Sequence, residues 1–219
     1  MNKEELALAL RGRTPEQQTV IKYFEGTGGG CFNFEKQISD DEYHSLVMSK
    51  VKSLNLRKRA MDKHSLDESQ INEIEPLHLE NWYFSSDNDK TRTRAKKGVD
   101  GYYRSSAYQT TIIFFGAAQV YIYQYTLNMD EDSKKEVTED YFYKDITNFS
   151  TTSESYEKKI WYSGGCGGGA GEYRNETMES NLFVITVPGD KFRCSMVETD
   201  DIERRIKGMK EKLREKKGS

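Results

Sequence analysis

Two adjacent segments in the middle of the chain, YQTTIIFF (108–115) and AAQVYIYQYTL (117–127), constrain its fold most strongly. Both are rich in β-branched and aromatic residues, which favour strands. In the second segment aliphatic and tyrosine side chains alternate, with Val120 and Ile122 set against Tyr121, Tyr123 and Tyr125. Because successive side chains of a strand point to opposite faces, this alternation predicts one aliphatic face and one tyrosine face. Gly116 separates the segments, so we expect two neighbouring strands.

Further runs of the same kind lie on both sides of this pair. They are LHLENWYF (77–84), EDYFYKDITNFST (139–151), EKKIWYS (157–163), NLFVITV (181–187) and KFRCSM (191–196). Within 139–151 we expect a continuous strand in which Phe142 points away from Tyr141 and Tyr143. Pro188-Gly189-Asp190 separates the last two runs and predicts a tight hairpin turn. Fourteen tyrosines and an aromatic content of 12% agree with packed strands rather than with disorder.

The first 75 residues show a different pattern, which predicts helices. Three times a Ser or Thr is followed, three residues later, by Glu or Gln, so that the two side chains can bond the unpaired amides at a helix start. These patterns begin at Thr14, Ser39 and Ser65. After the second pattern, apolar residues recur at spacings of three and four: Tyr43, Leu46, Val47, Val51 and Leu54. We expect the third helix to run through Ile71 and Ile74 and to end near Pro76.

The last residues of the chain predict one amphipathic helix. Its apolar stripe consists of Ile202, Ile206, Met209 and Leu213, and its basic face of Arg204, Lys207, Lys210, Arg214 and Lys217. Asp200, with Glu203 three residues later, is the expected N-cap. Because such a stripe must cover an apolar surface, we expect this helix to pack on the strands. The fold class is therefore α+β, with a helical segment at 1–75 and a strand-rich domain at 76–219.

The element order from about residue 76 to 217, about seven antiparallel strands and then one amphipathic helix, resembles a pleckstrin-homology-like (PH-like) domain. The segments YFYKDITNFST and NLFVITVPGDKFRCSM, leading into DIERRIKGMKEKLRE, are similar to bacterial members. The resemblance implies two near-orthogonal sheets that form a partly open barrel, with the C-terminal helix closing one end. It leaves out the helical segment, and by itself it does not supply a function.

A basic run, KTRTRAKKGVDGYYR (90–104), lies between the first two predicted strands. Its cationic side chains are Lys90, Arg92, Arg94, Lys96, Lys97 and Arg104. In PH-like domains that bind phosphorylated lipid headgroups, the loop at this place supplies cations to the phosphates, so the resemblance implies an anion-binding or acidic-lipid-binding site. The alternative is a solvated hairpin tip whose charges serve solubility.

The glycine-rich stretch SGGCGGGAGEY (163–173) does not fit a nucleotide-binding loop. Such a loop needs a lysine and a hydroxyl residue after its glycines and a helix behind them. Here Glu172 follows the glycines, and the next predicted element is a strand. The stretch therefore predicts a long flexible loop between two strands.

The three cysteines, Cys31, Cys166 and Cys194, are far apart in the sequence. No pair has metal-ligand spacing, which argues against a zinc site and a disulfide framework and favours a reducing compartment. A cysteine-dependent enzyme would need a base near Cys166 or Cys31, and the three histidines are distant in the sequence. We expect Cys194 to be a small strand residue.

Charge and hydropathy restrict the class of protein. The net charge of −3, from 33 basic and 36 acidic residues, gives no general attraction to nucleic acid. The start MNKEELALALRGRT has no apolar run of signal-peptide length, and no span approaches about 18 apolar residues. We therefore expect a cytoplasmic protein without a transmembrane segment and without a nucleic-acid partner.

These observations favour a non-enzymatic binding or scaffolding module with a protein partner and with no metal or cofactor. If the tyrosine face of 117–127 is exposed, Tyr121, Tyr123 and Tyr125 would form the docking patch for that partner. If the N-terminal helices cover this face, the two halves of the chain form one unit. The alternatives are an anion or acidic-lipid binder that uses the 90–104 loop and, third, a cysteine-dependent enzyme.

Overall fold

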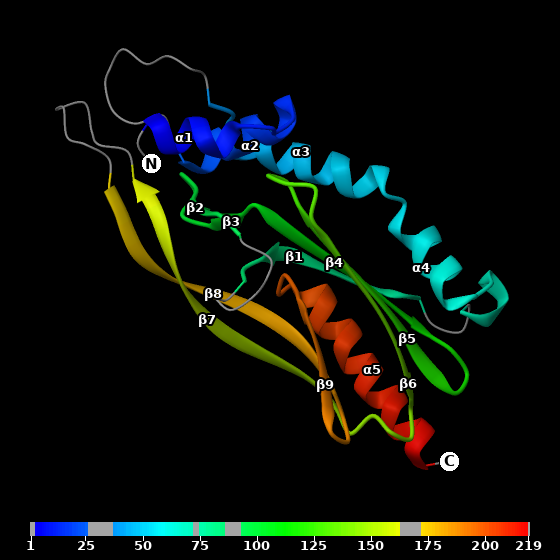
Figure 1. The fold of residues 1–219 in the computed structure, drawn as a ribbon. Coiled ribbons are helices and arrows are strands. Elements are labelled where there is room, and N and C mark those ends of the chain that lie inside the picture. The colour runs from blue at the N-terminus through cyan, green and yellow to red at the C-terminus, as the bar shows by residue number, and fades with distance from the viewer. Residues whose placement is uncertain (1–2, 26–36, 72–74, 86–92, 163–171, 219) are drawn as a thin grey trace.

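The computed structural model describes residues 3–25, 37–71, 75–85, 93–162 and 172–218. These residues form an α+β fold in which nine strands make three antiparallel sheets, none of them closed (Figure 1). The helices are α1 (Lys3–Leu10), α2 (Pro15–Glu25), α3 (Asp40–Ser53), α4 (Leu56–His64) and α5 (Asp200–Gly218), with a 3₁₀ turn at Glu68–Gln70. The strands are β1 (Leu77–Tyr83), β2 (Ala95–Lys97), β3 (Tyr103–Ser105), β4 (Ala107–Phe115), β5 (Gln119–Asn128), β6 (Lys134–Phe142), β7 (Asn148–Tyr162), β8 (Glu172–Val187) and β9 (Asp190–Ser195).

Two of the three predicted helix starts are confirmed. The Thr14 amide donates to Gln17 Oε1 (3.0 Å) and the Gln17 amide donates to Thr14 Oγ1 (3.2 Å) at the start of α2. Ser39 and Glu42 make the same reciprocal pair before α3.

The third predicted helix start is wrong. Ser65 ends α4 in the left-handed conformation (φ 54°), and Asp67, two residues later, accepts the amides of Ser69 and Gln70 at the 3₁₀ turn. The preceding residues are already helical, so Ser65 lies at the end of a helix instead of its start. Residues 72–74, through which the third helix was expected to continue, lie outside the described residues.

The strands form two meanders and one inserted hairpin. The larger sheet has the order β1-β4-β5-β6 and the smaller one has the order β7-β8-β9. Strands β2 and β3, which lie between β1 and β4 in the chain, pair only with each other within the described residues. The predicted turn at Pro188-Gly189 joins β8 to β9, with Gly189 at φ 84° and Val187 paired with Asp190.

The predicted continuous strand over 139–151 is wrong. The chain leaves β6 after Phe142 and turns before β7, which belongs to the other sheet. Tyr143 and Ile146 are buried in this turn, and the Tyr143 hydroxyl donates to the Gly116 carbonyl (3.1 Å). Their apolar side chains thus anchor a corner between two sheets instead of continuing the alternation of one strand.

The four-stranded sheet is the middle layer of the molecule. Helices α2–α4 cover one of its faces, and the β7-β8-β9 sheet with α5 covers the other (Figure 1). As the alternation in β5 predicts, Val120 and Ile122 belong to the core under β7–β9 and α5. Tyr123 and Tyr125 belong to the core under the helices. The helical segment and the strand-rich part therefore share a core.

The C-terminal helix is present, and its apolar stripe packs as predicted. Ile206, Met209 and Leu213 are buried among residues of both sheets. Its N-cap is Thr199 and not Asp200: Thr199 Oγ1 accepts the Ile202 amide (3.3 Å), and Asp200 is the first helical residue. Of the helices in the described part of the chain, none has the length and apolarity that crossing a membrane requires.

Glu136 of β6 fastens α4 to the sheet and gives a testable pH dependence. Arg59 of α4 donates to both of its oxygens (2.8 Å each), and the Tyr123 hydroxyl donates to Oε1 (2.7 Å). The hydrogen bonds from Arg59 lower the pKa of Glu136 from 4.5 to about 2. This contribution to stability is present above pH 4.5 and is lost as the pH falls toward 2.

We expect Glu136→Gln to lower the free energy of unfolding at neutral pH and to flatten its fall between pH 4.5 and 2. Urea unfolding at a series of pH values measures both effects. Glu179→Gln, at an exposed position of β8, is the matched control and should keep the wild-type slope. An acid slope of Glu136→Gln equal to that of wild type would contradict the role of the ionised carboxylate.

Candidate functional site

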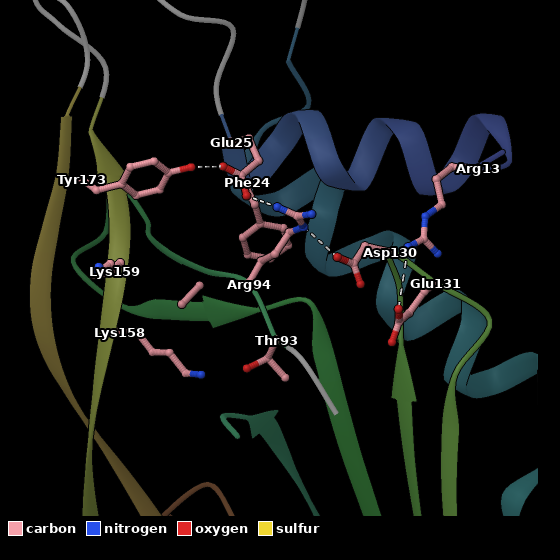
Figure 2. A pocket seen from close by; sticks show the side chains of 11 residues that line it. Arg13, Phe24, Glu25, Thr93, Arg94, Asp130, Glu131, Lys158, Lys159 and Tyr173 are labelled. Carbon is pink, nitrogen blue, oxygen red and sulfur yellow. Dashed lines mark hydrogen bonds and ion pairs between the residues drawn. The ribbon is translucent and has the colours of Figure 1, made fainter. Parts of the chain in front are cut away.

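A pocket of about 410 Å³ lies where the helical layer meets the end of β7 and the start of β8 (Figure 2). We call it the junction pocket. Its lining comes from the α1–α2 connection, the end of α2, the start of β2 with the two residues before it, the β5–β6 turn, β7 and β8. The residues are Arg13, Phe24, Glu25, Thr93, Arg94, Ala95, Asp130, Glu131, Lys158, Lys159 and Tyr173. Segments far apart in the sequence therefore converge on a strongly charged cavity.

Arg94 lies between two carboxylates at the inner wall of this pocket (Figure 2). Its Nε donates to Asp130 Oδ2 (2.7 Å) and its Nη1 donates to Glu25 Oε1. The Tyr173 hydroxyl donates to the other oxygen of Glu25 (2.6 Å). The Glu25 and Asp130 side chains are only 9% and 10% exposed. Charge-assisted bonds of this kind are strong, so the cluster ties α2, the segment just before β2, β8 and the β5–β6 turn together.

Backbone pairing fixes the position of both ends of this cluster. Ser106 holds Arg94 from two sides: its Oγ accepts the Arg94 amide, and its amide donates to the Arg94 carbonyl (3.0 Å each). The Ser106 carbonyl accepts the amide of Met129, the residue before Asp130 (2.8 Å). One residue between β3 and β4 therefore aligns the cation with its acidic partner.

Asp130 is incompletely satisfied within this cluster. Among the described residues no group donates a hydrogen bond to its buried Oδ1. Burial raises the pKa of the Asp130 carboxyl, although Arg94 opposes the shift. Nearby at the rim, Arg13 and Glu131 form a looser ion pair of 3.7 Å.

The structure gives the basic run internal partners. Arg94 is paired as described, and Arg104 pairs with Asp100 (2.7 Å) and lies 3.8 Å from Asp40. Lys96 Nζ lies 3.9 Å from the centre of the Tyr23 ring, and Lys97 lies over the Tyr103 ring. The contacts of Lys96 with Tyr23 and of Arg104 with Asp40 attach the β2–β3 hairpin to α2 and α3, whereas the other two lie within the hairpin. Lys90 and Arg92 lie outside the described residues, and anion or lipid binding by this run stays a prediction.

The tyrosine face of β5 is covered by the chain itself. Tyr123 is fully buried, Tyr125 is 5% exposed and Tyr121 is half-buried, and all three pack with residues of the helical layer. Of the two alternatives left open by the sequence, covering by the N-terminal helices is the one observed. An exposed docking patch made of these three tyrosines is therefore not present.

A second hollow, of about 390 Å³, lies between the start of β7 and the last half of α5. We call it the β7–α5 groove. Its walls are residues 147–151 on one side and Lys210, Leu213, Arg214 and Lys217 on the other. Within the described residues β7 pairs with β8 alone, so its other backbone edge remains open beside this basic helix face. Sequence reasoning identified the basic face but not the strand edge that lies next to it.

The described cysteine does not suit catalysis. Cys194 is buried in β9, as predicted, and burial raises the pKa of its thiol to about 12. Cys31, Cys166 and the predicted loop 163–171 lie outside the described residues. In the part of the chain that the structure describes, no group of three or more His, Cys, Asp or Glu side chains is placed to hold a metal ion.

Comparison of the chain with protein-family models, with curated proteins and with solved structures finds no match. The functional assignment therefore depends on the geometry of the two hollows.

Proposed function

We propose that this chain is a non-enzymatic binding module of PH-like architecture whose protein partner inserts an extended, acidic segment into the β7–α5 groove. The observation that carries the proposal is the open edge of β7 beside three cations of α5. Cytoplasmic location remains part of the proposal.

The element order supports the PH-like architecture. A four-stranded meander is followed by a three-stranded meander and a C-terminal helix that packs between them. The β2–β3 hairpin is an insertion in the connection from β1 to β4. Both sheets are open, which agrees with the partly open barrel that the resemblance implies.

An unpaired strand edge is a template for an added strand, because its amides and carbonyls lack partners in the sheet. The lining of the groove includes two buried apolar side chains, Phe149 and Leu213. Its lining, which lies wholly within the described residues, contains cations and no carboxylate. Backbone pairing would therefore supply affinity, and the cations of α5 would select acidic partners.

Fluorescence anisotropy with a labelled 12-residue peptide that alternates Glu and Val tests the proposal. We expect saturable binding at low salt, and we expect Lys210→Glu with Arg214→Glu to weaken it at least about tenfold, since two attractive charges become repulsive. Arg204→Glu with Lys207→Glu, the same charge change on the same helix outside the groove, is the matched control and should bind like wild type.

Two further measurements identify the binding mode. The same peptide with alternate amides N-methylated should lose binding, because it cannot pair with β7 on that edge. Absence of binding by wild type, or equal binding by the two charge variants, would overturn the proposal. Binding to vesicles that contain acidic lipid without any binding to the peptide would replace it with the anion-binding alternative.

A further inference from the structure

We propose that Asp130 is a proton-binding site that links pH to the packing of the junction pocket. It is separate from the β7–α5 groove and does not depend on the function proposed for it. The inference starts from the charge of the cluster at the inner wall of the pocket.

The cluster holds two acids and one base. Glu25 and Asp130, both about nine-tenths buried, share the single guanidinium of Arg94. With all three groups ionised, the cluster carries one excess negative charge in a poorly solvated place. An unbalanced buried charge is costly, and uptake of one proton removes the imbalance.

The bonding pattern identifies which acid takes the proton. Both oxygens of Glu25 accept hydrogen bonds, one from Arg94 and one from Tyr173. Asp130 accepts one hydrogen bond from Arg94 on Oδ2, while its Oδ1 is buried without a donor. An ionised carboxylate is an acceptor at both oxygens, so the unsatisfied oxygen penalises the charged form of Asp130 and not that of Glu25.

The groups around Asp130 act in both directions. Arg94, directly before β2, and Arg13 of the α1–α2 connection favour the ionised form. Burial and Glu131, the next residue in the chain, favour the protonated form. Glu25 of α2 competes for Arg94. The negative charge of Asp130 also contributes to the raised pKa of Tyr43 in α3. Lys158 and Lys159 of β7 and Tyr173 of β8 line the opposite wall of the pocket. Burial is the largest influence, and it raises the pKa of Asp130 above 3.8.

The direction of the pH effect follows from the raised pKa of Asp130. A carboxyl with a raised pKa in the folded protein stabilises it at low pH, and this contribution is lost as the pH rises through the folded value. Ionisation of Asp130 therefore loosens the junction, and protonation tightens it around the remaining Glu25–Arg94 pair. The Met129 amide, next to Asp130, donates to the Ser106 carbonyl and holds this turn in place. When the turn moves away from Ser106, the amide becomes exposed to solvent.

Carboxyl ¹³C NMR of the folded wild-type protein measures the proton directly. We expect the Asp130 signal to titrate above the ordinary carboxyl value of 3.8, because burial disfavours the ionised form. Asp100, whose pKa Arg104 lowers to about 2, should titrate below it in the same spectra. The Asp130 signal is the one that disappears in Asp130→Asn, or it is assigned through the backbone if that variant does not fold. Titration of Asp130 at or below 3.8 would overturn the proposal.

Hydrogen exchange tests the coupling to packing. Protection of the Met129 amide, corrected for its intrinsic exchange rate, should fall in wild type as the pH rises through the Asp130 midpoint. Asp130→Asn cannot ionise, so its protection should stay constant over the same range. Constant protection in wild type would show that the proton has no effect on the junction and would contradict the link.

Discussion

Replacement of Arg94 by alanine will lower the free energy of unfolding by about 3 kcal/mol at neutral pH, the amount typical for a buried ion pair that loses one partner. The reason is that Glu25 and Asp130 are nine-tenths buried and would remain without a cation. Protonation of carboxylates that have lost their cation relieves part of this cost, so the loss should become smaller as the pH is lowered.

Urea unfolding of wild type and variant at two pH values measures the Arg94 effect. Arg193→Ala is the matched control, because Arg193 forms an ion pair with Glu154 but is 52% exposed. Exposed pairs contribute about 1 kcal/mol or less, so the control should remain close to wild type. Equal losses for the two alanine variants would show that the junction cluster contributes no more than a surface pair.

Replacement of Phe183 by alanine is expected to cost about 3 to 5 kcal/mol, as for other large-to-small changes in a packed core. Phe183 of β8 is fully buried and stacks on Phe149 of β7, with ring centres 5.9 Å apart. It belongs to the core that the four-stranded sheet, the β7-β8-β9 sheet and α5 have in common. The cavity left by the ring would therefore weaken the packing of both sheets and of α5 against one another.

Thermal and urea unfolding with far-UV and near-UV circular dichroism measure the Phe183 effect. Phe142→Ala is the matched control, because Phe142 at the end of β6 is 49% exposed. Removing this ring should cost about 1 kcal/mol or less. Because the helices and the strands share a core, both probes should report one common transition in the variant. A loss below 1 kcal/mol for Phe183→Ala would contradict its central place in the packing.

Local pattern was sufficient to predict the elements whose residues follow one period. The alternation in 117–127 identifies both faces of β5, and the stripe from Ile206 to Leu213 identifies the buried face of α5. The pattern failed where tertiary contacts replace periodicity. Tyr143 and Ile146 continue the apolar composition of β6, which predicts a single strand through 139–151. In the structure the chain turns there, and both side chains fill the corner between two sheets.

The candidate sites were less predictable, because their partners are distant in the sequence. Arg94 is 69 residues from Glu25 and 36 residues from Asp130, and a sequence shows that a charge exists but not which charge faces it. The basic run 90–104 consequently resembled a ligand loop, although its described cations have internal partners. In the β7–α5 groove the sequence showed the cations of α5 but not the neighbouring strand edge.

The β7–β8 hairpin connects the two hollows of the molecule. Residues 147–151 border the β7–α5 groove, and Lys158 and Lys159 farther along β7 border the junction pocket. Seven residues of extended chain, from 151 to 158, span about 23 Å. If a partner bound at the groove changes proton binding at Asp130, thermodynamic reciprocity requires that acidification change the affinity for that partner by the same factor.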